Sequence, residues 1–193
     1  MTTSLSHHFV IEACNNAWAN HRLLSACSQL THEEFIARRV SFFPSLQHTL
    51  NHILTVDEYY LEMLERSRDG LAPHEDPGRH FEPEIPFAEC RTLATAQRDC
   101  DQRLILYCGT MDDARMEEDV LIPRKTGVMR DRVHRILAHL FQHQIHHRGQ
   151  AHAMLAGTHV KPPQLDEFYC ANEAHLREKD FEELGFDEKM IWG

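Results

Sequence analysis

A row of histidines on an apolar helical face, within residues 130–156, decides what kind of fold this chain can adopt. His139, His143 and His147 are spaced four residues apart. An α-helix turns about 100° per residue, so side chains at this spacing share one face and lie about 6 Å apart along the axis. The same face carries apolar residues, namely Ile136, Leu140 and Met154. The pattern predicts a long helix that brings imidazoles against its neighbours, and Gly157 is expected to end it.

Three further segments carry apolar side chains at spacings of three and four, which is the pattern of an amphipathic helix. They are residues 5–30, 45–69 and 87–109, and Gly70 is expected to end the second of them. No convincing strand pattern accompanies these segments. We therefore predict an all-α fold in which four helices form a bundle.

The remaining segments connect or follow these helices. Residues 71–86 are rich in proline and read as a loop. Residues 110–129 are charged and contain "EEDVLIPRKTGV", which indicates either a small hairpin or an extended crossing loop. Residues 171–193 form either a fifth, peripheral helix or a tail. We expect residues 1–170 to make up the bundle, and residues 171–193 to be an extension packed on it or placed at a dimer interface.

Length and charge exclude several kinds of partner. The chain has 193 residues, which is enough for one domain with a real core. Its net charge is 20 − 30 = −10 with neutral histidines, and an acidic chain gains no counterion release on nucleic acid. No apolar run is long enough for a membrane helix, and the N-terminus lacks the features of a signal peptide. We expect a cytoplasmic protein without nucleic-acid or membrane partners.

The six cysteines are widely spread and form no CxxC pair. In the cytosol such residues are expected to be reduced thiols and not a disulfide framework. Cys100 and Cys108 fall on the third predicted helix, where they are either reactive thiols facing a site or buried, inert side chains.

The histidine row also predicts a metal site. A buried imidazole needs partners for its ring nitrogens, and two histidines at i and i+4 can bind one divalent ion. One helix rarely completes such a site, so a third ligand is expected from a facing helix. The second predicted helix offers His48 and His52, and His52 lies nearer its apolar face. The plainer alternative is that these histidines are core or rim residues hydrogen-bonded to backbone and water.

Several motifs resemble the DinB family of bacterial proteins, the metal-binding helical family and not the polymerase of that name. They are "NNAWANHRLL", "HTLNHILTVDEYY", "HLFQHQIHHRGQAHAML" and "KPPQLDEFY". The resemblance covers roughly residues 5–170, and its most specific part is His143-x3-His147-Arg-Gly-Gln. It implies a four-helix bundle with a long crossover connection, and residues 171–193 go beyond the recognised pattern.

The resemblance also implies a metal triad of one histidine from the second helix and the HxxxH pair of the fourth. At the matching positions these are His52, His143 and His147. The expected ion is nickel or zinc, and the expected assembly is a homodimer. Related branches include S-transferases and an isomerase that use a low-molecular-weight thiol, while many members have no known activity.

Neighbouring residues have both a functional and a plain interpretation. His139, one turn before the HxxxH pair, is either a hydrogen-bond partner of the ligands or a substrate contact, or it is simply a packed helix residue. Gln150, one turn after the pair, is expected to hydrogen-bond a ligand or a bound water. Asp57 either orients a ligand histidine or, as its position about 140° from His52 around the helix favours, lies at the bundle edge or in solvent. Arg148 is expected to pair with an acidic neighbour, and Gly149 to allow close approach of another helix.

Two functions from different classes follow. Three imidazoles leave an open position on a zinc ion, as catalytic sites do, which favours a metal-dependent enzyme of the thiol-dependent S-transferase or hydrolase type acting on a small-molecule substrate. The alternative is a non-catalytic, stress-associated bundle in which the metal is structural. No carboxylate stands beside the histidine pair in the sequence, which weakens the hydrolase interpretation.

Overall fold

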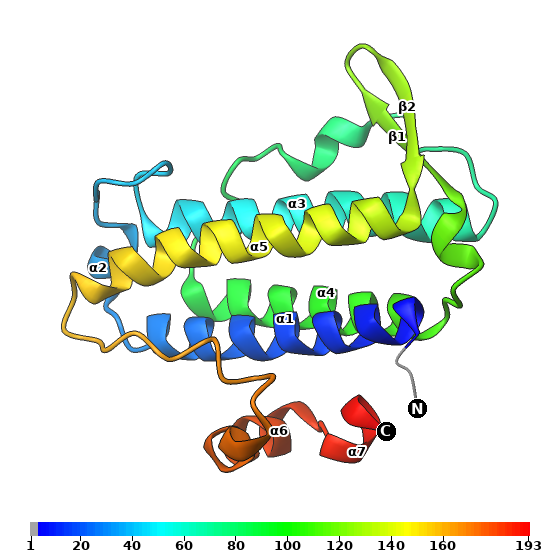
Figure 1. The fold of residues 1–193 in the computed structure, drawn as a ribbon. Helices are drawn as coiled ribbons and strands as arrows, with labels where there is room; N and C mark the ends of the chain where they lie inside the picture. The colour runs from blue at the N-terminus through cyan, green and yellow to red at the C-terminus, as the bar shows by residue number, and fades with distance from the viewer. Residues whose placement is uncertain (1–3) are drawn as a thin grey trace.

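Four long helices dominate the computed structural model, which describes residues 4–193 (Figure 1). They are α1 (Leu5–Cys27), α3 (Leu46–Arg68), α4 (Cys90–Gly109) and α5 (Val133–Ala156). Helices α1 and α4 lie side by side in one layer, and α3 and α5 form the other layer. Across the layers α3 packs on α4 and α1 packs on α5, so the four helices enclose one apolar core. The prediction of a mostly helical chain is confirmed.

The helix ends follow from local chemistry. The side chain of Ser45 accepts a hydrogen bond from the His48 N–H and so caps the first turn of α3. Gly70 adopts a φ of +68° just after this helix, and the next N–H, that of Leu71, donates to the Arg66 carbonyl. The left-handed conformation favours glycine at this position. Gly157 caps α5, as its place in the sequence predicts.

The segment before α5 corrects the expected all-α class. After the short 3₁₀ helix η2 (Arg115–Glu117), strands β1 (Asp119–Arg124) and β2 (Gly127–Arg132) form an antiparallel hairpin. The alternating side chains of Val120 and Ile122 are buried in the main core, whereas β2 is mostly exposed. The hairpin extends to residue 132, so α5 begins three residues later than predicted.

Two short elements lie in the connections. Helix α2 (His32–Ile36) begins with a capping box, in which Thr31 and Glu34 satisfy each other's N–H groups. A 3₁₀ turn, η1 (Pro77–His80), lies in the proline-rich loop. The connection between α2 and α3 brings two phenylalanines, Phe42 and Phe43, toward α5.

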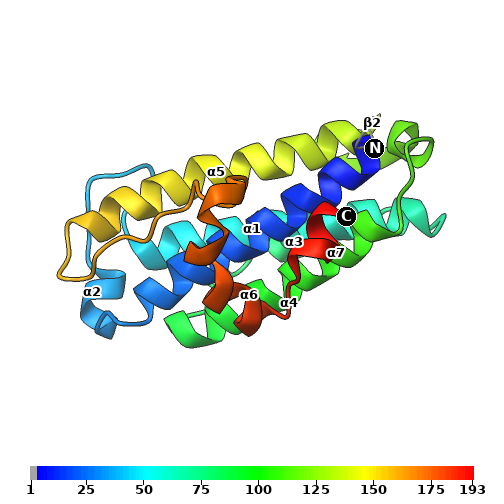
Figure 2. The ribbon, with the colours of Figure 1, turned by 60° about the horizontal axis from the view of Figure 1, so that its bottom comes forward.

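The C-terminal segment folds as three short helical pieces and not as one peripheral helix. They are η3 (Ala171–Leu176), α6 (Glu178–Leu184) and α7 (Glu188–Trp192), which lie over α1 and α4 (Figure 2). A second apolar cluster joins this segment to the outer face of α1, and Trp18 is fully buried against Phe168 within it. The division of the chain at residue 170 stays a prediction.

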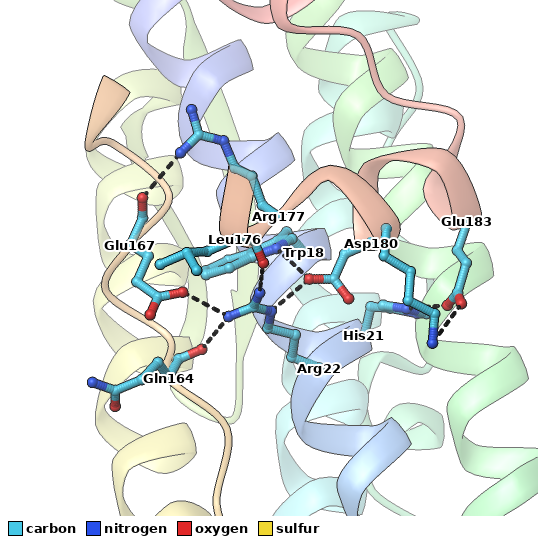
Figure 3. Close-up of polar contacts among 10 residues, drawn as sticks. Trp18, His21, Arg22, Gln164, Glu167, Leu176, Arg177, Asp180 and Glu183 are labelled. Carbon is cyan, nitrogen blue, oxygen red and sulfur yellow. Dashed lines mark hydrogen bonds and ion pairs between the residues drawn. The ribbon is translucent and has the colours of Figure 1, made fainter. Parts of the chain in front are cut away.

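Polar contacts reinforce this packing (Figure 3). The Arg22 guanidinium donates to the carboxylates of Asp180 and Glu167 and to two main-chain carbonyl oxygens, of Gln164 and Leu176. Arg177 is 1% exposed and pairs with Glu188. Arg22 of α1 therefore fastens the segment to the body of the protein, and the Arg177–Glu188 pair joins two of the short helical pieces to each other.

No helix within residues 4–193 combines the length and the apolar character needed to cross a membrane. All six cysteines are unpaired, as predicted. Cys100 and Cys108 are buried, and burial raises the pKa of both thiols well above the ordinary value. Of the two interpretations of these residues, the structure favours the buried one, because a raised pKa disfavours the reactive thiolate.

Candidate metal centre

Three histidines from two helices converge between α3 and α5. His52 comes from α3, and His143 and His147 come from α5. Each offers one ring nitrogen, and the three nitrogens all lie within 4.8 Å of one another. The Nε2 atoms of His52 and His143 are 3.1 Å apart. The structure thus brings together the three residues that the resemblance implies, and leaves His48 outside the group.

The spacing of these nitrogens fits a shared divalent ion. Two imidazole nitrogens at the usual 2.0–2.1 Å from a tetrahedral zinc lie about 3.3 Å apart, close to the 3.1 Å observed between His52 and His143. The Nδ1 atom of His143 is buried and has no hydrogen-bond partner among the described residues. This gap counts against the plain interpretation, in which hydrogen bonds satisfy both nitrogens of a buried imidazole.

Gln150 sets the orientation of His147. The His147 Nδ1–H donates to the Gln150 Oε1 at 2.9 Å, so the lone pair of this ring is on Nε2. The amide nitrogen of Gln150 donates in turn to His146 Nε2 at 3.0 Å. A second residue that holds a ligand histidine in one tautomer is a common feature of metal sites.

Burial keeps the three imidazoles neutral. It lowers the pKa of His52 to about 4 and that of His143 to about 3, and repulsion from His147 adds to the shift in both. The pKa of His147 is also lowered by burial, although the bond to Gln150 opposes the shift. Neutral imidazole is the form that binds metal ions, so the cluster is in its ligand form at pH 7.

Aromatic rings cover one side of the triad. The Phe43 ring lies 4.4 Å from the His52 ring and 5.7 Å from the His147 ring, measured between centroids. Phe42 contacts His147 at 6.2 Å but is itself 77% exposed. The connection between α2 and α3 therefore forms a partial apolar cover.

A pocket of about 390 Å³ opens beside the triad. Its lining includes Phe43, His48 and His52 from α3 and the residues before it, and Phe81 and Glu84 from the loop that follows η1. His48 Nε2 is 2.8 Å from a carboxylate oxygen of Glu84. The sequence carries no signal for this carboxylate, because Glu84 lies in an irregular loop in which no periodicity marks the direction of a side chain.

The other motif residues have less direct roles. His139 is exposed and its ring lies 5.2 Å from that of Tyr60 and 6.3 Å from that of His143. Gly149 faces open space, because a Cβ built there meets no atom within 4 Å. The expectation of a close helix approach at Gly149 is wrong.

Asp57 also differs from its expected place at the bundle edge. It is 1% exposed and accepts hydrogen bonds from the side-chain amides of Gln97 and Gln144. The helix wheel placed it away from His52 correctly, but that direction points to α4 and α5 and not to solvent. Asp57 is therefore part of the core.

A polar network around Asp57 crosses the core and joins all four long helices. The Arg148 guanidinium donates to three side-chain amide oxygens, and the amide nitrogens of the same residues donate to two carboxyl groups. The amides belong to Asn16, Asn20 and Gln144, and the carboxyl groups belong to Asp57 and Asp101. The side-chain amide of Gln97 donates to both carboxyl groups and so bridges them. Arg148 thus reaches acidic groups through amides and not by the direct pair that was expected.

Burial shifts the pKa of every charged member of the network. It raises the pKa of Asp57 well above the ordinary value and that of Asp101 to about 7, and it lowers that of Arg148 to about 10. The sequence does carry a signal for this network. Polar residues recur at i and i+4 on three apolar helices, as Asn16 and Asn20, Gln97 and Asp101, and Gln144 and Arg148.

Comparison with known proteins identifies the family of this chain. Residues 1–180 match the DinB family. Protein DinB of Bacillus subtilis (strain 168) is 26% identical over 142 residues, which cover 72% of this chain and 80% of that protein. The uncharacterized protein YizA of the same organism is 28% identical over 127 residues, or 64% of this chain and 71% of YizA. Because the family match spans most of the chain, this protein belongs to the DinB family.

Proposed function

We propose that the chain is a four-helix bundle with a long crossover connection, in which His52, His143 and His147 bind one divalent metal ion. The observation that carries this proposal is the approach of three neutral imidazole nitrogens to within 4.8 Å of one another. The orientation of His147 by Gln150 supports it. Imidazole suits nickel and zinc alike, so both ions are candidates.

We further propose that the site is catalytic, of the thiol-dependent S-transferase or hydrolase type. Three protein ligands leave a coordination position for a small molecule, and the pocket beside His52 gives it access. A bound divalent ion lowers the pKa of a coordinated thiol or water. His48, paired with Glu84, lies in the same pocket and would accept the released proton. Phe43 and Phe81 would limit the entry of water.

A structural metal is the alternative function. The packing of Phe43 over His52 and His147 favours it, because a covered ion would pin α3 to α5 without exchanging ligands. In either case the expectation from the family resemblance is a cytoplasmic homodimer, and the small molecule of the catalytic case would be a low-molecular-weight thiol.

Elemental analysis of tag-free protein, after dialysis against a mild chelator, tests the ligand assignment. We expect about one nickel or zinc ion per chain in the wild type, and almost none in His52→Ala, His143→Ala or His147→Ala, because two imidazoles bind a divalent ion far more weakly than three. His159→Ala and His175→Ala, which change exposed histidines outside the triad, are the matched controls. Full metal content in all three triad variants would refute the site.

Cobalt substitution separates the two functions. A visible spectrum that changes on addition of a low-molecular-weight thiol would show an exchangeable coordination position and support the catalytic proposal. A spectrum that thiols and small anions leave unchanged would favour the structural role.

A further inference from the structure

A second cavity, of about 380 Å³, lies between α1, α4 and the segment that follows α6. The triad is in the other layer of the fold, between α3 and α5, so the two sites are separate (Figure 1). The volume falls at the lower end of the range for pockets that bind small molecules. No residue of the triad or of the pocket beside it takes part in the lining.

The walls of this cavity are largely apolar. Leu24 contributes from α1, and Ala94 and Ile105 contribute from α4. Leu184 and Phe186 close one side from the C-terminal segment, which Arg22 and Asp180 hold in place (Figure 3). The C-terminal extension therefore supplies part of the apolar wall.

The rim of the cavity is positively charged, in a chain whose net charge is −10. Arg91 and Arg98 both line it, and neither forms an ion pair within residues 4–193. Arg98 donates only to the main-chain carbonyl of Glu183. Many other arginines of the chain do have acidic partners, including Arg22 and Arg103. The two rim guanidiniums therefore remain available to an anion.

The floor of the cavity does not oppose such a ligand. Asp101 is the one carboxyl group among the described residues of the lining, and it is 5% exposed. Amide groups of Asn16, Asn20 and Gln97 already donate to it. Its charge is engaged inside the polar network, whereas the free positive charges are at the mouth.

We propose that this cavity binds a small amphipathic organic anion, with its apolar body between α1, α4 and Phe186 and its carboxylate or sulfonate at Arg91 and Arg98. The apolar walls supply binding by burial of hydrocarbon surface. The unpaired guanidiniums supply charge-assisted hydrogen bonds and select for an anion. The site is independent of the metal centre, so the protein would bind this ligand whether or not the triad is occupied.

The test uses the full chain and anilinonaphthalene sulfonate, a fluorescent apolar anion. We expect saturable binding with about one dye per chain, displacement by decanoate, and much weaker displacement by the neutral decanol. Ala94→Trp should reduce dye affinity at least tenfold, because an indole fills the cavity. The matched control is Leu106→Trp, which adds a ring at an exposed position of the same helix.

Neutral substitutions test the anion contact. The double variant Arg91→Gln, Arg98→Gln should bind the dye about fivefold more weakly, as expected for two partly exposed ion pairs. Arg38→Gln changes an exposed arginine that has no ion pair among the described residues, and should have no effect. Chelated protein and His147→Ala should bind the dye as the wild type does. Circular dichroism and thermal unfolding establish that each variant is folded.

Two results would overturn the proposal. One is the absence of saturable dye binding to the folded wild type. The other is equal affinity in the wild type and in Ala94→Trp, since the dye would then be bound elsewhere. Equal displacement by decanoate and decanol would remove the anion selectivity on which the assignment of the ligand class depends.

Discussion

Helix α5 carries two polar clusters built from adjacent residues, and they differ in how their polar atoms are paired. His143 and His147 belong to the triad, while their neighbours Gln144 and Arg148 belong to the buried network, in which Gln144 donates to Asp57 and Arg148 donates to Asn20. In the network amide groups link the guanidinium to both carboxyl groups, and of the carboxylate oxygens only the Asp57 Oδ1 lacks a partner among the described residues.

The triad also leaves one buried atom without a partner within residues 4–193, but its ring nitrogens are arranged differently. Its imidazole nitrogens face one another, and the Nδ1 of His143 has no partner in the part of the chain that the structure describes. Buried polar residues are thus not all alike. A cluster whose donors and acceptors pair with one another stabilises a unique packing. A cluster whose acceptor nitrogens converge on one point is suited to a ligand at that point.

Removing the cation of the network should strongly destabilise the fold. Arg148→Met keeps an unbranched side chain but leaves buried amide and carboxyl groups without their positive partner. We expect the free energy of unfolding to fall by about 3–5 kcal/mol. Urea unfolding followed by circular dichroism measures this change. Arg38→Met, at an exposed position, should change stability by less than about 0.5 kcal/mol. A loss below about 1 kcal/mol in Arg148→Met would show that the network is dispensable.

Removing the hydrogen bond that orients His147 should weaken metal binding and leave the stability of the fold almost unchanged. Gln150→Ala removes the acceptor that fixes the tautomer of His147, so we expect metal affinity to fall by about 10–100-fold. The metal-free protein should unfold almost as the wild type does. Competition with a coloured chelator measures the affinity. Gln142→Ala, at an exposed position of the same helix, is the control. A large loss of stability without any change in affinity would assign Gln150 to packing.

The buried network should also change how the free energy of unfolding depends on pH. Burial raises the pKa of Asp101 to about 7 in the folded protein, above its value of about 3.9 in an unfolded chain. The folded state therefore binds this proton more tightly, and its contribution to stability is present at low pH and is lost as pH rises from about 4 to about 7. Asp101→Asn cannot titrate.

We therefore expect the stability of the wild type minus that of Asp101→Asn to decrease across this window, by roughly 1 kcal/mol per pH unit. Chelated protein should be used for both proteins, so that metal release does not contribute to the curves. The histidines are present in both proteins and largely cancel in the difference, whereas Asp57, whose pKa the charge of Asp101 helps to raise, adds to the same decrease. Parallel curves over the whole window would contradict a raised pKa at Asp101.

Local sequence pattern was enough to predict the long helices and the histidine row. Periodicity of apolar residues depends only on the geometry of one helix, so residues 5–30, 45–69, 87–109 and 130–156 were each predicted to within a few residues of the observed ends. The spacing of His143 and His147 likewise determines that they share a face. The family resemblance then supplied His52 as their partner.

Only the tertiary structure decided which polar residues meet. The rotation of α3 places His52 against α5 and His48 in the side pocket, and it buries Asp57, which the helix wheel alone left at an edge. Arg148 and Asn16 are 132 positions apart in the chain and yet share a hydrogen bond. Glu84 reaches His48 from a loop, and Phe186 closes a cavity from the C-terminal segment. Periodicity within one element cannot specify such contacts, because they depend on how separate elements pack together.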